Sequence, residues 1–193
     1  MKTDRRPYRR ESEDSRREAL IAATQALVSE GGARAATVRA IAERAGVTPG
    51  LIRHYFGSKD ELSRAAYRQL IDGMTDKGSE ALSGAGAAPE ERLAVFVAAS
   101  LRPPVLDSAA VGLWAGYLHT VRADPALLAA HERGYLRYRD VLQGLIAGLG
   151  RPGATDEQMR REAIACNAVI DGLWMEGGCC RTALRPVSWC ASG

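Results

Sequence analysis

Residues between positions 37 and 59 carry the side chains that a protein needs to bind a nucleic acid. The guanidinium group of Arg53 can donate hydrogen bonds to O6 and N7 of guanine, a contact worth about 1–3 kcal/mol of discrimination. Pro49 and Gly50 are small enough to let a helix approach the bases closely. Hydroxyl and N–H groups at helix starts bind phosphates. The candidate contacts are Thr37, Arg39, Thr48, Pro49, Gly50, Arg53, His54, Tyr55 and Lys59.

Two short helices joined by a tight turn are predicted to position these side chains. An apolar stripe predicts a helix over 37–45, and Gly46 relieves the backbone of the turn that follows. Thr48 can cap the next helix, and Pro49 suits its first position because a missing N–H costs nothing there. The sequence Ser-Lys-Asp-Glu at 58–61 is a capping box that predicts a fourth helix, running to about residue 76.

The second of these short helices is expected to stand outward from a small core. Val47 and Ile52 point into that core, and this leaves the beginning of the helix exposed for entry into a major groove. Other interpretations stay open at this point. Arg39 and Arg53 can be ordinary solvated charges, and Tyr55 can be a packing residue.

The positive charge of the chain is unevenly distributed. The chain has a net charge of +3, and all of this excess lies in the first 60 residues, because the remainder is slightly acidic. Such asymmetry indicates that the N-terminal end meets a polyanion. A basic arm over 1–14, for which disorder is one expectation, and the arginines just after it either add non-specific attraction or form a weakly contributing tail. Its arginines are Arg5, Arg6, Arg9 and Arg10, followed by Arg16 and Arg17.

The rest of the chain is also predicted to be helical. Apolar periodicity predicts helices over 90–101, 108–122, 125–149 and 155–176, separated by Pro- and Gly-containing segments, with a loop over 77–89. Thr155 begins a second capping box. No run of about 18 apolar residues predicts a membrane span, and the basic N-terminus lacks the apolar core of a secretory signal. The chain is therefore expected to be cytoplasmic.

Catalytic and metal-binding motifs are not recognisable in the sequence. The three histidines are scattered, and no Ser-His-Asp order, phosphate-binding glycine loop or His-Glu-x-x-His pattern occurs. Cys179, Cys180 and Cys190 have spacings that match no standard zinc site. We therefore expect no enzymatic activity, no cofactor and no bound metal.

The segment TVRAIAERAGVTPGLIRHYFGSKDEL closely resembles the DNA-binding domain of the TetR family of bacterial transcriptional regulators. The resemblance covers about residues 15–65. The order HYFGSK, with Arg53 and Tyr55 where many members have Tyr and His, is similar to the choline-responsive BetI branch, so base contacts do not transfer directly from the wider family. A looser resemblance to that branch, carried by GLWAGYLHTVRADP and VIDGLWMEGG, spans about 90–178.

The resemblance implies an all-α homodimer that binds a double-stranded DNA operator and a small-molecule effector. Residues 15–62 would form a three-helix helix-turn-helix domain, 63–178 a larger effector-binding and dimerisation domain, and 179–193 a tail. Dimerisation is expected through helices at about 125–149 and 155–176. Small residues at Ala163, Ala165 and Ala168, with Ile164 and Ile170, would allow close packing there, although they can also pack within one subunit.

Aromatic and acidic residues at helical spacing suggest the effector site. Aromatic faces attract a quaternary ammonium ion, and a carboxylate balances its charge. The candidates are Trp114, Tyr117, Tyr135, Tyr138, Asp171 and Trp174. Plain core or dimer packing is the alternative for these residues. The expected function is a repressor released by a small molecule, with a choline-like quaternary ammonium ion as the candidate effector. The alternatives are an efflux-pump repressor that senses a lipophilic or cationic drug, and a sequence-blind DNA-binding protein.

Overall fold

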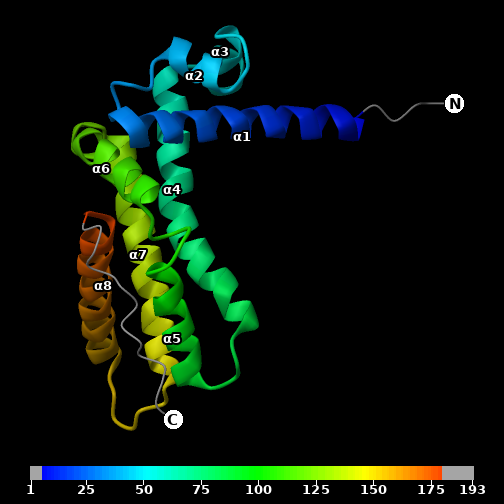
Figure 1. The fold of residues 1–193 in the computed structure, drawn as a ribbon. Coiled ribbons are helices and arrows are strands. Elements are labelled where there is room, and N and C mark those ends of the chain that lie inside the picture. The colour runs from blue at the N-terminus through cyan, green and yellow to red at the C-terminus, as the bar shows by residue number, and fades with distance from the viewer. Residues whose placement is uncertain (1–5, 180–193) are drawn as a thin grey trace, which may run out of the picture. The chain divides into compact units, whose positions relative to one another are not determined.

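The computed structural model describes the backbone of residues 6–179 and the side chains of 13–177, and its elements are helical throughout this range. Figure 1 shows them along the chain. They are α1 (Arg6–Gly31), α2 (Val38–Arg44), α3 (Gly50–Phe56), α4 (Lys59–Ala81), a short 3-10 turn η1 (Leu82–Gly84), α5 (Pro89–Ser100), α6 (Ser108–Ala123), α7 (Pro125–Gly148) and α8 (Asp156–Cys179). The predicted all-α class is confirmed.

Packing divides the helices into two compact units. Unit 1 contains the chain up to Leu70 together with Gly112–Leu128, and unit 2 contains Ile71–Val111 together with the chain from Ala129 on. Three helices, α4, α6 and α7, therefore contribute residues to both units. The predicted domain boundary between residues 62 and 63 falls inside α4, whereas the packing divides at Leu70. The domain limits drawn from the sequence remain a functional prediction.

Unit 1 is built on apolar side chains from α1, α2, α3, α4 and α6. Leu20, Ile41 and Leu62 are completely buried, and Ile52 is 2% exposed. The rings of Tyr67 and Tyr117 lie 5.1 Å apart, centroid to centroid. Burial of these groups supplies most of the driving force that holds two very short helices, α2 and α3, in place.

The hydroxyl caps predicted at Ser58 and Thr155 are present, and Thr37 supplies a further cap that was not predicted. Thr37 accepts a hydrogen bond from the Ala40 backbone N–H at 3.2 Å, Ser58 accepts one from Glu61 at 3.1 Å, and Thr155 accepts one from Gln158 at 3.2 Å. The predicted hydroxyl cap at Thr48 is wrong. The cap position of α3 is Pro49, which makes no side-chain cap bond, and the Thr48 backbone carbonyl accepts from Leu51 instead. Since the first turn of α3 is closed through the backbone, the Thr48 hydroxyl is not used there.

Two helices extend further than the sequence pattern predicts. Helix α1 begins at Arg6, so residues 6–14 are helical rather than a disordered arm. Helix α4 continues to Ala81, five residues beyond its expected end. Polar and charged residues in both extensions hide the apolar stripe on which a periodicity argument depends. Residues 1–5, including Arg5 of the predicted arm, lie outside the described part of the chain.

Unit 2 has its own hydrophobic core. Phe96, Leu142, Ile146, Ala163 and Ile170 form one buried cluster. Two residues expected at the dimer contact, Ala163 and Ile170, are therefore packed inside the subunit, with exposures of 0% and 6%. The other three, Ile164, Ala165 and Ala168, are exposed on α8. None of the described helices is both long enough and apolar enough to cross a membrane.

Candidate nucleic-acid interface and ligand cavity

The first turn of α3 presents an exposed surface in unit 1. Thr48, Pro49, Gly50, Arg53 and His54 are all exposed, as expected for side chains that would contact bases or phosphates. The opposite side of the helix is anchored by buried Ile52. Helix α2, next to α3 in Figure 1, is joined to it by a turn that contains Gly46 at φ 65°, the left-handed conformation that favours glycine.

The remaining predicted contacts lie around this surface with different exposures. Thr37 and Arg39 are exposed at the start of α2. Tyr55 is half-buried, with its ring centroid 4.9 Å from that of His54, so it both packs and keeps an exposed portion. Lys59 is half-buried at the start of α4. The structure thus brings the nine candidates to two short helices and the beginning of α4 within unit 1.

Arg17 takes part in this arrangement in a way that the sequence did not predict. Its Nη1 atom donates a hydrogen bond to the Tyr55 backbone carbonyl at 2.5 Å, and its guanidinium carbon lies 4.5 Å from the centroid of the Phe56 ring. The interpretation of Arg17 as part of a non-specific basic arm therefore changes. Arg17 fixes the end of α3 to α1. Because Arg17 and Tyr55 are 38 positions apart, no local sequence pattern predicts this contact.

A second arginine joins α2 to α1. Both terminal nitrogens of Arg44 donate to the carboxylate of Glu30, at 2.6 and 2.7 Å. This paired geometry lowers the pKa of Glu30 through the hydrogen bonds from Arg44. Because both side chains are well exposed, the ion pair orients α2 more than it stabilises the fold.

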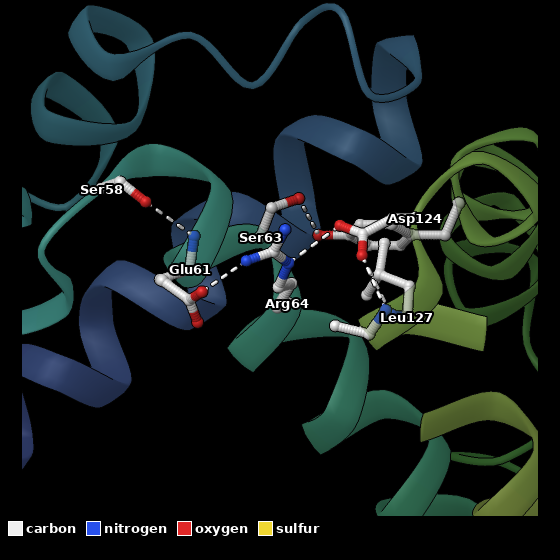
Figure 2. Close-up of polar contacts among 8 residues, drawn as sticks. Ser58, Glu61, Ser63, Arg64, Asp124 and Leu127 are labelled. Carbon is white, nitrogen blue, oxygen red and sulfur yellow. Dashed lines mark hydrogen bonds and ion pairs between the residues drawn. The ribbon is translucent and has the colours of Figure 1, made fainter. Parts of the chain in front are cut away.

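Arg64 connects α4 to the start of α7 within unit 1. Figure 2 shows its guanidinium group between two carboxylates: Nε donates to Asp124 Oδ2 at 2.8 Å, and Nη1 forms an ion pair with Glu61. Asp124 Oδ1 accepts from the Ala126 N–H at 2.9 Å and so caps α7. The hydrogen bond from Arg64 is the main reason that the pKa of Asp124 is lowered.

Unit 2 contains a small cavity whose lining includes four of the six predicted effector residues. Its volume is about 40 Å³, room for a few waters or a compact ligand. Three elements, α4, α7 and α8, supply most of the wall. The lining residues are Ile71, Met74, Thr75, Ser100, Val105, Gly134, Tyr135, Tyr138, Asn167, Ile170, Asp171 and Trp174.

Trp114 and Tyr117 are not among the described residues that line this cavity. Tyr117 is completely buried in unit 1, where Ser63 Oγ donates a hydrogen bond to its hydroxyl oxygen at 3.3 Å. Trp114 is half-buried in the same unit. The structure therefore groups Tyr135, Tyr138, Asp171 and Trp174 and separates the other two aromatic residues from them.

Polar groups in the cavity are organised around Asp171. Asn167 Nδ2 donates to Asp171 Oδ2 at 3.0 Å, and the Tyr135 hydroxyl also hydrogen-bonds the carboxylate. Burial raises the pKa of Asp171, and the positive charge of Arg139 and these two hydrogen bonds oppose that rise. Asp171 is thus a hydrogen-bonded carboxyl group in a partly desolvated site, where its negative charge attracts a cation more strongly than it would in water.

The aromatic walls are held by their own hydrogen bonds. The Tyr138 and Ser100 hydroxyls lie 2.7 Å apart, and Trp174 Nε1 donates to the Val105 backbone carbonyl at 3.0 Å. Burial is the main cause that raises the pKa of Tyr135 to about 12, and the negative charge of Asp171 is the second cause. Burial also raises the pKa of Tyr138 to about 12. Both phenols are therefore neutral donors at physiological pH.

Metal ligation is not indicated in the described part of the chain, where no group of three His, Cys, Asp or Glu side chains is placed to hold an ion. Cys180 and Cys190 lie outside the described residues, and Cys179 is described only as the last residue of α8.

A helix-turn-helix with an exposed second helix, together with a separate unit that holds a ligand-sized cavity, defines a ligand-responsive DNA-binding regulator. Comparison with protein families agrees with this class. Residues 20–66 match the family of bacterial regulatory proteins of the tetR family, and residues 89–185 match the BetI-type transcriptional repressor C-terminal domain. The chain belongs to the TetR family and has a BetI-type C-terminal domain.

Individual relatives cover most of the chain. The HTH-type transcriptional regulator BetI of Stenotrophomonas maltophilia is 31% identical over 86% of this chain and 82% of its own length, and that of Rhizobium meliloti is 34% identical over 84% and 78%. A putative transcriptional regulator from Pseudomonas aeruginosa has a similar structure, with a TM-score of 0.80, 31% identity, and coverage of 89% of this chain and 83% of its own.

One further structure was determined with a small molecule bound. A putative transcriptional regulator from Saccharomonospora viridis, in complex with choline, has a TM-score of 0.70 and 22% identity, and covers 83% of each chain. At this level of identity the likeness shows the shared fold.

Proposed function

We propose that this protein is a repressor that binds a palindromic operator as a homodimer and releases it when a small quaternary ammonium effector enters the unit 2 cavity. The proposal rests on one observation above the others. Asp171, three aromatic residues and a compact cavity come together in the unit that matches the BetI-type domain.

The DNA-contact role is assigned to the exposed surface of α3 and its neighbours. Arg53 is the proposed reader of a guanine, and Pro49 and Gly50 allow the helix to approach closely. Thr37 and Lys59, at the beginnings of α2 and α4, would bind phosphates. This assignment is supported by the exposure of Pro49, Gly50 and Arg53 on the helix that buried Ile52 anchors.

Dimerisation is proposed through α7 and α8. Large apolar side chains remain exposed on these helices, including Leu136 at 48%, Ile164 at 41% and Val169 at 62%. Exposed apolar surface of this kind favours association. A dimer would present two copies of α3, and these must lie about 34–36 Å apart to reach successive major grooves of one operator.

A quaternary ammonium effector suits the cavity better than a bulky drug. The aromatic rings of Tyr135, Tyr138 and Trp174 can attract the cation, and Asp171 can balance its charge. The Saccharomonospora viridis protein, which has this fold, was determined in complex with choline, and this supports the proposal. A volume of about 40 Å³ favours a compact effector, because a large lipophilic molecule would require the walls to open.

Helix α4 is the proposed route of coupling. It supplies Ile71, Met74 and Thr75 to the cavity and carries Lys59 at its other end. An effector that binds better to the conformation with more widely spaced recognition helices shifts the population away from DNA.

A competition experiment tests the proposal. Fluorescence anisotropy would follow full-length protein on a labelled operator, selected from random duplexes, while choline or its uncharged tert-butyl analogue is added. We expect choline alone to release the operator, and Asp171→Asn to bind the operator normally but to lose most of the response. Equal release by the uncharged analogue, or no release by either compound, would contradict a quaternary ammonium effector.

A further inference from the structure

Ile71 on α4 and Gly134 on α7 meet at the wall of the unit 2 cavity, and both residues line it. A Cβ atom at Gly134 would lie 1.9 Å from Ile71 Cγ2, so the Ile71 side chain occupies the space that any larger residue at position 134 would need. Ile71 itself is buried, with an exposure of 4%. The missing side chain at Gly134 therefore lets α4 approach α7 closely enough to place a branched aliphatic group in the cavity wall.

The Ile71 side chain is a rigid part of this wall. A β-branched residue within a helix has one strongly preferred χ1 rotamer, and the α7 backbone at Gly134 closes the space on one side of it. Met74, the other apolar side chain that α4 supplies to the cavity, is unbranched and can change its conformation. Of these two side chains, Ile71 is the one that cannot easily make way for a larger ligand.

Hydrogen bonds hold the aromatic walls in place. The Tyr138 hydroxyl is bonded to that of Ser100, and Trp174 Nε1 is bonded to the Val105 carbonyl. An ammonium ion with longer substituents on nitrogen must therefore displace a wall in order to enter a cavity of about 40 Å³. The position of Ile71 depends on packing alone, so a substitution there changes the size of the site without removing a polar contact.

We propose that Ile71 determines the size specificity of the effector site: the site admits a trimethylammonium group and excludes the larger triethylammonium group. This inference rests on the proposed quaternary ammonium effector and narrows it by the size of the substituents on nitrogen. Extra methylene groups in a filled apolar site force side chains out of their preferred rotamers. A single methylene group can change affinity by about 10- to 200-fold in such a site.

Choline and triethylcholine test the inference, because these cations have the same charge and the same hydroxyethyl group and differ only in the three alkyl groups. Isothermal titration calorimetry on full-length wild-type protein should give a Kd for triethylcholine at least about tenfold higher than that for choline. Ile71→Ala should bring the two Kd values within about threefold, because triethylcholine gains the space of the lost side chain. Triethylcholine should also release the labelled operator from Ile71→Ala but not from wild type.

Two further variants control for the loss of packing. Ile146→Ala makes the same truncation at a buried position of α7 that is not among the described lining residues, so it should keep the wild-type ratio of the two Kd values. Ile71→Val is a milder truncation that preserves more of the packing, and it should give an intermediate ratio. Circular dichroism would establish that each variant is folded.

The outcomes separate this inference from the effector proposal. Equal Kd values for the two cations in wild type, or a ratio that neither Ile71 variant changes, would mean that Ile71 does not limit the size of the ligand, while choline-dependent operator release would still support the effector proposal. An equal narrowing of the ratio by Ile146→Ala would assign the effect to general loosening of unit 2, which also overturns the inference. Binding of neither cation to wild type would contradict the quaternary ammonium effector itself and the inference with it.

Discussion

Arg17 on α1 donates a hydrogen bond to the backbone carbonyl oxygen of Tyr55, near the end of α3, over a distance of 2.5 Å. The same guanidinium group lies over the ring of Phe56, the last residue of that helix. A helix of seven residues has little stability of its own, so its orientation depends on such contacts. Arg17 is thus a positioning residue for the DNA-contact surface.

Replacing Arg17 by Met should loosen α3. The loss of one charge-assisted hydrogen bond and one cation–π contact should reduce the free energy of unfolding by about 1–2 kcal/mol and weaken specific operator binding more than non-specific binding. Arg16→Met removes the same charge from an exposed neighbouring position and is the matched control. Equal effects of the two substitutions on specific binding would assign Arg17 to phosphate attraction alone.

Arg53→Ala should reduce specificity for the operator. The expected loss is about 10- to 100-fold in affinity for the specific duplex, with a much smaller change for a scrambled duplex at the same salt concentration. Arg68→Ala, at an exposed position of α4 outside the predicted contact set, should change neither value substantially. Parallel losses on both duplexes would show that Arg53 neutralises phosphate without reading a base.

The Arg64–Asp124 ion pair should make stability depend on pH in the acid range. Because the pKa of Asp124 is lower in the folded state than in the unfolded chain, its contribution is fully present above its ordinary value of about 4 and is lost as pH falls through the lowered value. The difference in Tm between wild type and Asp124→Asn should be constant from about pH 7 to pH 5 and shrink below about pH 4.

Arg64→Gln supplies the second arm of this measurement. It removes the cation that lowers the pKa of Asp124, so it should abolish the same acid-range dependence, and the double variant should differ little from either single one. A difference that stays constant down to pH 3 would mean that the ionised form of Asp124 adds nothing to the stability of the fold.

Gly134 and Gly144 on α7 should respond oppositely to substitution by Ala. A Cβ atom at Gly134 would lie 1.9 Å from Ile71 Cγ2, and Ile71 lines the cavity, so the change should destabilise the protein by about 1–3 kcal/mol and weaken effector binding. Nothing lies within 4 Å of a Cβ atom at Gly144, where Ala should stabilise the helix by about 1 kcal/mol. Thermal unfolding of the two variants measures both effects; a stabilised Gly134→Ala would mean that α4 and α7 can separate freely.

The sequence predicted those features that depend on neighbouring residues. Helix order follows apolar periodicity, and the caps at Ser58 and Thr155 follow a local pairing of hydroxyl and N–H groups. Thr48 has the same residue type, but the turn before α3 closes through its carbonyl group, and residue type does not distinguish these two choices.

Features that depend on distant packing were not predictable in this way. Tyr117 and Tyr135 have equivalent helical spacing to an aromatic partner, yet one is buried in unit 1 and the other lines the cavity of unit 2. The packing of the helices against one another determines which of the two tyrosines lines the cavity. Arg17 was missed as a positioning residue for the same reason, since it acts on groups whose proximity comes from folding.

Unit 1 is assembled from two stretches of chain separated by more than forty residues. Within it, Tyr117 covers Tyr67, and Gly116 lies against Val28 closely enough that a Cβ atom there would approach its side chain to 2.8 Å. A fragment ending at Leu70 would therefore leave apolar surface uncovered. Chimaeras that graft this DNA-reading portion onto another sensor must carry residues 112–128 with it, so recombination at a single crossover point does not yield an intact module.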